Sequence, residues 1–561
     1  MIPQLTALIT RALQKTAQGR GLDPAAFSRK FVVEIPANPE RGHFSTNAAM
    51  IHARDFALAV PGLKGNPALL LARELVDALE RPPDFFSAVE IAGPGFINFR
   101  LAKAAWQKLL QEIRARGDSY GKRPPTGQKI LVEYVSSNPT GPLHVGHGRG
   151  AAWGDAFSRI LEYLGHEVTR EYYVNDAGNQ IATLGKSILF RALHPDLSVP
   201  PPEGHYKGAY IKELADSFLQ KRPRDFFAEP QAAAIMSEEA AQAILAEMRA
   251  DLVAFGVEFD SWFSEKSLIA SGELEKAVAL LREKGLVYEK DGALFFESSA
   301  LGDDKDRVLR KSDGSWTYFA SDVAYHANKY ARGFDRLIDV LGADHVGYLG
   351  RMRAVARALG RPDASLKIVL YQLVRLFRGG VPYKMSVRAG EFIPLKVVMD
   401  EVSPDAARFL YLTQSHDSTL DFDLELAKSQ SAENPVYYVQ YLCARAFQVR
   451  AKAQALFSLE GDIDFSLLSE PGELALIQKL SLFPEVVGAS GDNFAPHFLT
   501  TWLMDAAKLF HRYYGETRLV LPDNPELTRA RIALAMTVRA VVGTGLSLLG
   551  VSVPERMAKE S

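Results

Sequence analysis

Residues 136–147 read Ser136-Ser137-Asn138-Pro139-Thr140-Gly141-Pro142-Leu143-His144-Val145-Gly146-His147. The residues before them, 129–135, are mostly apolar and β-branched, which is typical of a buried strand. Phe157, Ile160, Leu161 and Leu164 follow at helical spacing, so the stretch is predicted to join a strand to an amphipathic helix. Open α/β sheets bind ligands at such turns, outside the carboxyl end of a strand.

This turn has the composition of a polyphosphate site. Gly146 and Gly148 remove Cβ atoms at the predicted helix start, where unpaired N–H groups and the helix dipole favour an anion. His144 and His147 are three residues apart, so we expect both rings to face the same way and to donate hydrogen bonds to phosphate oxygens. The alternative is a pair of surface or metal-binding histidines. A P-loop is excluded because no Gly-Lys-Ser/Thr triplet closes the turn.

The tetrapeptide at 144–147, preceded by an Asn-Pro pair, resembles the first signature of class I aminoacyl-tRNA synthetases. The second signature of that class is resembled by Lys384-Met385-Ser386-Val387-Arg388-Ala389-Gly390, in the expected downstream place. The block 132–144 is similar to arginyl-tRNA synthetases in particular, as are 173–180, 313–322, 433–441 and 545–551. The resemblance therefore covers essentially the whole chain.

The resemblance implies a multidomain α/β protein with a Rossmann-like, doubly wound parallel sheet. We expect an N-terminal α+β module that contacts tRNA at 1–105, a linker at 106–127, the catalytic domain at 128–404 and an all-α anticodon-binding domain at 405–561. A connective insertion is expected around 185–300. It looks too small and too helical for an editing domain.

The activity that the resemblance implies is ligation of arginine to tRNA. L-Arginine is activated with ATP to arginyl-adenylate and then passes to the 3′-terminal adenosine of tRNA(Arg). Mg²⁺ is expected with the nucleotide, and no dedicated metal site is predicted. The expected catalytic residues are His144, His147, Lys384, Ser386 and Arg388. The expected ATP-binding residues are Gly141, His144, Gly146, His147, Gly148, Lys384 and Met385.

An arginine pocket must match a guanidinium, which is always charged and offers five donors in a planar fork. Tyr318 and Asp322 are four apart and would share a helical face. By resemblance, Asp322 pairs with the guanidinium while Tyr318 and Glu133 surround it; taken alone, Asp322 could equally be a cap or a surface carboxylate. Glu133 stands in an apolar strand, where an unpaired carboxylate is costly, so a cation is expected beside it. The residues expected around arginine are Glu133, Ser136, Asn138, His144, Tyr318 and Asp322.

The second signature departs from the common form of the class. Val387 replaces the second lysine, and the upstream position at which some family members carry a compensating lysine is Gly141. Lys384 or Arg388 must then supply the positive charge to pyrophosphate, and an arginine can do so bidentately.

Composition sets further bounds. The chain has 561 residues, 47% of them hydrophobic, which allows several domains with buried cores. The single cysteine, Cys443, excludes an internal disulfide and fits an apolar helix face, and no apolar run is long enough to predict a membrane span. The net charge of −2 says nothing in favour of RNA binding. We expect a cytoplasmic protein, and the family likeness suggests a monomer.

Three alternatives stay open from sequence alone. They are a class I synthetase for another amino acid, a small-molecule nucleotidyltransferase with a similar histidine turn, and a catalytically idle tRNA-binding or scaffold protein. Residues that could contact unpaired tRNA bases are Arg512, Tyr513, Tyr514 and Arg518, although such rings are more often core.

Overall fold

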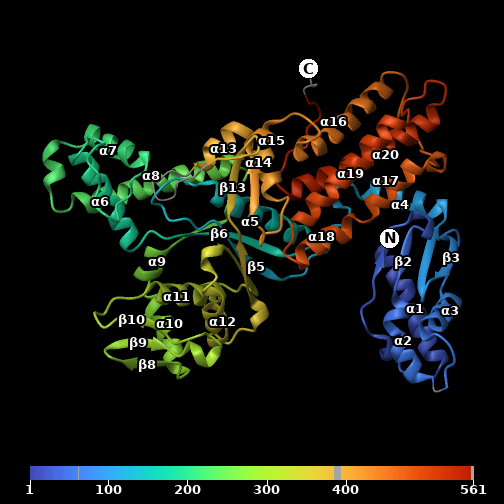
Figure 1. The fold of residues 1–561 in the computed structure, drawn as a ribbon, viewed down its shortest axis with the longest axis horizontal. Helices are drawn as coiled ribbons and strands as arrows, with labels where there is room; N and C mark the ends of the chain where they lie inside the picture. The colour runs from blue at the N-terminus through green and yellow to red at the C-terminus, as the bar shows by residue number, and fades with distance from the viewer. Residues whose placement is uncertain (61, 384–392, 558–561) are drawn as a thin grey trace.

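In the computed structural model, residues 1–60, 62–383 and 393–557 are described. They form an N-terminal module, a catalytic region built on a parallel sheet, and a C-terminal bundle of helices that adjoins both (Figure 1). The helices of the bundle are α16 (Pro435–Gln454), α17 (Pro471–Ser481), α18 (Phe483–Asp492), α19 (His497–Glu516) and α20 (Pro525–Leu548).

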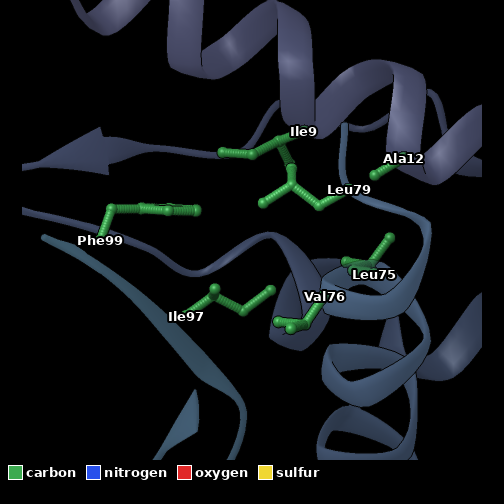
Figure 2. A pocket seen from close by; sticks show the side chains of 7 residues that line it. All are labelled: Ile9, Ala12, Leu75, Val76, Leu79, Ile97 and Phe99. Atoms are coloured by element: carbon green, nitrogen blue, oxygen red, sulfur yellow. The ribbon is translucent and has the colours of Figure 1, made fainter. Parts of the chain in front are cut away.

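The N-terminal module is a four-stranded antiparallel sheet, in the order β1-β2-β4-β3, covered by helices. Its elements are α1 (Ile2–Gly19), β1 (Val33–Glu34), β2 (Phe44–Thr46), α2 (Ala48–Ala59), α3 (Pro67–Ala78), β3 (Phe86–Ala92) and β4 (Phe96–Leu101). Figure 2 shows a gap between α1, α3 and β4, lined only by apolar side chains such as Ile9, Leu75 and Phe99 and too small to admit water. It is a packing feature of the module's core and carries no chemistry. The helix α4 (Lys103–Arg116) leads out of the module.

The catalytic region contains a five-stranded parallel sheet in the order β12-β11-β5-β6-β7. Its strands are β5 (Lys129–Glu133), β6 (Glu167–Val174), β7 (Ser261–Ser264), β11 (Arg336–Gly342) and β12 (Leu366–Tyr371). Alternate residues of β5 enter different cores: Ile130 and Val132 belong to the core on the α5 side, and Leu131 to the core on the side of α11 and α12. The doubly wound sheet is thereby confirmed.

Helices connect these strands and cover both faces of the sheet. They are α5 (Val145–Tyr163), α6 (Asn179–Leu193), α7 (Ala209–Lys221), α8 (Ala232–Ala254), α9 (Glu265–Ala270), α10 (Glu273–Glu283), α11 (Tyr318–Ala331) and α12 (Tyr348–Ala358). A small antiparallel sheet is formed by β8 (Val287–Lys290), β9 (Ala293–Phe296) and β10 (Arg307–Arg310). The range 185–300, expected as one insertion, includes β7 of the main sheet, so the additional segments lie on both sides of that strand.

A second small sheet links the catalytic region to the bundle. It consists of β13 (Val374–Arg378), β14 (Val381–Pro382) and β15 (Leu420–Asp423), and the helices beside it are α13 (Leu395–Val402), α14 (Pro404–Tyr411) and α15 (Leu424–Lys428). The strand β15, which lies after residue 404, pairs in parallel with β13.

The helix α5 is buried around most of its surface, not on one face as its amphipathic pattern predicts. Its polar residues are held in internal pairs: Asp155 pairs with Arg408 and Arg159, and Arg149 donates to the carbonyls of Gln372 and Ser415. The bundle packs on one side of α5 and the sheet on the other. The polar residues of α5, which its amphipathic pattern would place in solvent, therefore bind other residues inside the protein.

Two features of the bundle follow from local sequence. Asn434 caps α16 by accepting the Val436 N–H, with Pro435 in the first turn. Cys443 is buried in the core, and burial raises the pKa of its thiol to about 12. In the described part of the chain, α20 is long and apolar enough to cross a membrane, but 72% of its apolar window is buried inside the protein.

Candidate active site

The histidine turn lies at the point where the strand order reverses. The chain runs from β5 to β6 and β7 on one side, then returns to β11 and β12 on the other, so β5 and β11 flank the reversal. In doubly wound sheets the crevice at this point, outside the carboxyl ends of the strands, is where ligands bind. The loop from β5 to α5, which carries residues 136–144, leaves β5 at this edge.

This loop begins with a sharp backbone turn. Val135 and Ser136 have φ angles of 67° and 41°, a left-handed conformation that is uncommon outside glycine and unfavourable for a β-branched residue. Two hydrogen bonds hold the turn: Ser136 Oγ donates to Glu133 Oε1 at 2.9 Å and accepts the Tyr173 N–H at 3.1 Å. These two hydrogen bonds of Ser136, a residue expected beside arginine, connect β5 to β6.

His144 and His147 stand together at the start of α5. Their rings stack with centroids 3.7 Å apart, which confirms that they face the same way. Each Nδ1 accepts a backbone N–H: His144 Nδ1 from Gly146 at 3.1 Å, and His147 Nδ1 from His144 at 3.3 Å. The two side chains therefore cap the helix reciprocally.

The hydrogen bonds fix the protonation of both rings. Burial lowers the pKa of His144, and burial together with the neighbouring His144 lowers the pKa of His147 to about 3. Both rings are neutral at physiological pH, and since each Nδ1 accepts, each proton is on Nε2. The pair offers two neutral N–H donors, which an anion can use without changing the charge of either ring.

The glycines of the turn also have a packing role. A Cβ on Gly148 would lie 2.6 Å from Leu395 Cδ1 and 3.0 Å from Tyr411 Oη, so the missing side chain admits α13 and α14, not a phosphate. A Cβ on Gly146 would lie 3.0 Å from Cε1 of His144, and one on Gly141 would lie 3.2 Å from the Tyr210 ring. Protein side chains thus fill the space where these Cβ atoms would stand, while the expectation that a phosphate approaches the backbone at Gly146 and Gly148 stays a prediction.

Gly148→Ala is therefore expected to destabilise the protein. Leu395 and Tyr411 are both buried and cannot move aside, so overpacking should lower the free energy of unfolding by about 1–2 kcal/mol despite the better helix propensity of alanine. The midpoint of urea unfolding measures this. Gly515→Ala is the matched control: its Cβ meets nothing within 4 Å on α19, and it should stabilise by up to about 1 kcal/mol. Equal midpoints for the Gly148 variant and the wild type would contradict the packing role.

Glu133 has a cationic partner, but the partner belongs to the protein. Lys329 Nζ lies 2.5 Å from Glu133 Oε2 and 2.8 Å from Asp339 Oδ1, and the lysine side chain is fully buried. The inference that Glu133 needs a cationic ligand is corrected accordingly: its charge is balanced from α11, 196 residues away in the chain.

Asp322 lies one turn into α11 and is not its cap. Thr317 caps that helix by accepting the Ala320 N–H. The Asp322 Oδ2 atom is shielded from solvent, and none of the described residues donates a hydrogen bond to it. Burial raises the pKa of the Asp322 carboxyl to about 7 against the opposing effects of His326 and a Tyr348 hydrogen bond. A buried carboxylate oxygen without a donor is costly, and a guanidinium would satisfy it.

Two other residues expected around arginine contact the start of α6 and the residue before it. Tyr318 is half exposed on the same helix, with its hydroxyl 3.3 Å from where a Gly178 Cβ would be. Asn138 Nδ2 donates to Gln180 Oε1 at 2.5 Å, which ties the histidine loop to the start of α6.

Sequence reasoning missed two neighbours of Asp322. Glu265 is buried at the start of α9, and its charge opposes ionisation of Asp322; Tyr348 on α12 hydrogen bonds to the Asp322 carboxyl. Burial also raises the pKa of the Glu265 carboxyl. Glu265 follows directly after β7, and an acid at the carboxyl end of a strand was the available signal.

Lys384, Met385, Ser386 and Arg388 lie outside the described residues. The chain on either side of them is anchored. Before them, β14 pairs with β13; after them, Pro394 forms an antiparallel bridge with His144, and the Leu395 N–H donates to the Leu143 carbonyl at 2.8 Å. Pro394 and Leu395 thus lie beside the histidine turn.

Comparisons with known proteins agree along the chain. Residues 109–427 match the model of the class I tRNA synthetase (R) catalytic domain, residues 439–557 the DALR anticodon binding domain, and residues 3–101 the arginyl tRNA synthetase N-terminal domain. An arginine–tRNA ligase of Syntrophotalea carbinolica is 48% identical over 536 residues, which cover 94% of each chain. The chain belongs to the arginyl-tRNA synthetases.

Solved structures of this family have the same fold. A crystal structure described as an arginyl-tRNA synthetase from Campylobacter jejuni is 35% identical, with a TM-score of 0.74, and covers 82% of this chain and 100% of its own. The arginyl-tRNA synthetase of Thermus thermophilus, at 24% identity, supports the fold alone, with a TM-score of 0.75 and coverage of 97% of this chain and 99% of its own. Membership of the arginyl-tRNA synthetase family excludes two of the alternatives left open by the sequence: a small-molecule nucleotidyltransferase and a synthetase for another amino acid.

Proposed function

We propose that the protein is an arginine–tRNA ligase that activates L-arginine with ATP and transfers it to the 3′-terminal adenosine of tRNA(Arg). The observation that carries the arginine assignment is the Asp322 carboxylate at the carboxyl edge of the sheet, whose Oδ2 atom is shielded from solvent and has no donor among the described residues. Lysine would offer a point charge to this site, and citrulline would offer none. A buried polar site can reject a ligand that leaves it unpaired by roughly 10⁴-fold.

Two steps make up the proposed reaction. The arginine carboxylate attacks the α-phosphorus of ATP, and pyrophosphate leaves; a ribose hydroxyl of tRNA then attacks the arginyl carbonyl, and AMP leaves. His144 and His147 donate from Nε2 to the α-phosphate, whose charge develops in the transition state. Lys384 and Arg388, with Ser386 and Met385, are proposed to hold the pyrophosphate end. Glu133, Ser136 and Asn138 shape the arginine side of the loop.

Mg²⁺ is proposed to arrive with the nucleotide. A Mg²⁺ ion that travels with ATP is bound mostly by phosphate oxygens and water. The ion would neutralise phosphate charge there.

The tRNA is proposed to contact the N-terminal module, residues 1–105, and the helical domain, residues 405–561. One sequence candidate fails: Tyr513 is buried, and its hydroxyl bonds to Glu473, so it cannot stack on a base. A better ring surface lies on α16, where Tyr437 and Tyr441 stack and the Arg445 guanidinium lies 4.2 Å over Tyr441. We also propose a monomer that works in the cytoplasm.

The pH dependence of arginine binding tests the pocket. Because the free Asp322 carboxyl has a pKa of about 7, it holds a proton below that pH and must lose it before it can pair with a guanidinium. The KM for arginine should therefore rise as pH falls below 7, by up to about tenfold per unit, and should be flat above 8. Aminoacylation at pH 5.5–8.5 measures this, with the KM for ATP as the control. An arginine KM that is constant down to pH 5.5 would speak against the pocket.

The function itself is tested by aminoacylation of total tRNA with each of the twenty amino acids. Only arginine should give a charged product. ATP–pyrophosphate exchange with and without tRNA then shows whether the first step needs tRNA, as the family likeness implies. A product with any other amino acid would overturn the proposal.

A further inference from the structure

His326 lies one helical turn after Asp322 on α11, and both of its ring nitrogens face oxygen acceptors. Nδ1 is 2.8 Å from the main-chain oxygen of Asp322, and Nε2 is 2.8 Å from Asp339 Oδ2 on β11. A carbonyl oxygen can only accept, and so can an ionised carboxylate. If Asp339 is ionised, both nitrogens must donate, and an imidazole that donates from both nitrogens is a cation.

Lys329 keeps Asp339 ionised. The ammonium group lies 2.8 Å from Asp339 Oδ1, and Lys329 and His326 together hold the pKa of that carboxyl well below its usual range. The other partners of Lys329 are Glu133 and the ring of Tyr325, whose centroid is 4.3 Å from Nζ. The buried network thus contains two carboxylates and two cations, and it is balanced without Asp322.

Asp322 meets charged and titratable groups from four other elements. Glu265 from α9 and Glu133 from β5 oppose its ionisation, Tyr348 from α12 hydrogen bonds to it, and Tyr173 from β6 lies close enough for its pKa to be raised by Asp322. Among the groups that act on Asp322 most strongly in the described structure, His326 is the one cation. A cation at this place favours the carboxylate over the protonated acid.

We propose that His326 is a positioning residue of the arginine pocket: an imidazolium, fixed by Asp339 and by the Asp322 carbonyl, that keeps the Asp322 carboxylate ionised for the guanidinium of the substrate. This inference rests on the proposed function. His326 acts through Asp322 and is buried beneath it on the same helix. Its role is to set the pH at which the pocket accepts arginine.

The test is the pH profile of the arginine KM in the His326→Gln variant. Glutamine can still donate a hydrogen bond to Asp339, but it carries no charge. We expect the midpoint of the profile to move up by about one pH unit, so that the KM at pH 7 rises up to about tenfold and approaches the wild-type value at pH 8.5. The kcat at saturating arginine and the KM for ATP should stay within about threefold, since neither depends on the charge of Asp322.

Two further variants make the result decisive. In Asp339→Asn the amide can donate to His326 Nε2, so the ring can become neutral while its contacts remain. The midpoint of the pH profile of the arginine KM should therefore also move up. His166→Gln is the matched control: His166 bonds to Thr126 just before β6, at the opposite end of that strand, and should leave the profile unchanged. Thermal melting confirms that each variant is folded.

The outcomes separate the two proposals. A folded His326→Gln variant with an unchanged profile, or with a KM raised equally at every pH, would overturn the positioning role. Failure of the wild-type protein to charge tRNA with arginine would overturn the proposed function, and it would be seen before any variant is made.

Discussion

Asp322→Asn is expected to raise the KM for arginine on the order of 10²–10³-fold, because it removes the charge that pairs with the guanidinium while the rest of the pocket stays buried. The amide has nearly the same shape, and Tyr348 can still hydrogen bond to its oxygen. The kcat at saturating arginine should fall less than kcat/KM, and the KM for ATP should not change. Steady-state aminoacylation with purified tRNA(Arg) measures all three.

The stability of the Asp322→Asn variant shows whether Asp322 serves substrate binding or the stability of the fold. The pKa of Asp322 is raised in the folded protein from its ordinary 3.8 to about 7, so ionisation favours the unfolded chain. This destabilisation grows as pH rises from about 4 and is complete above about 7. Asp322→Asn removes it, and its melting temperature at pH 8 should equal or exceed that of the wild type.

Asp313→Asn is the matched control for this variant. Asp313 is an exposed carboxylate in the same sequence segment, and it accepts hydrogen bonds from the Ser315 backbone and hydroxyl. Its loss should change the arginine KM less than about twofold, as expected for a surface group. If Asp322→Asn binds arginine as the wild type does, the guanidinium must be recognised elsewhere, and Glu265 would be the next carboxylate to test.

Local chemistry made the histidine turn and the helix caps predictable. Whether His144 and His147 share a face depends only on their spacing, and whether Asn434 and Pro435 begin a helix depends only on neighbouring residues. These features, like the apolar strand β5, are determined within a few residues along the chain. The doubly wound sheet as a whole was expected from the family resemblance, because strands such as β6 have no continuous apolar run.

Contacts between distant segments were not predictable in this way. Lys329 neutralises Glu133 across 196 residues, and nothing in the apolar strand 129–133 indicates that the cation comes from the protein. The packing role of Gly148 could not be predicted, because the side chains that approach it, Leu395 and Tyr411, lie far along the sequence. Glu265 comes near Asp322 only because β7 is the strand next to β6.

His144→Asn should separate the two tasks of His144. Asparagine is among the best N-cap residues, so its Oδ1 can accept the Gly146 N–H in place of Nδ1, and the melting temperature should change little. The Nε2–H donor is lost, and with it a hydrogen bond to the α-phosphate that strengthens in the transition state. The kcat for arginyl-adenylate formation should therefore fall by about 10²–10³-fold, with the KM for ATP changed only a few-fold.

The pH dependence of kcat shows whether His144 donates to the phosphate as a neutral ring or as an imidazolium. Since each Nδ1 of His144 and His147 accepts a backbone N–H, and burial lowers the pKa of both rings, the site favours neutral donors, and kcat at saturating arginine should not fall as pH rises from 6 to 8. Single-turnover adenylate formation measures this without product release. His194→Asn, an exposed histidine after α6, is the control and should behave as the wild type. A kcat that falls as pH rises through 6–7, and that does so only while His144 is present, would mean that an imidazolium and not a neutral N–H contacts the phosphate.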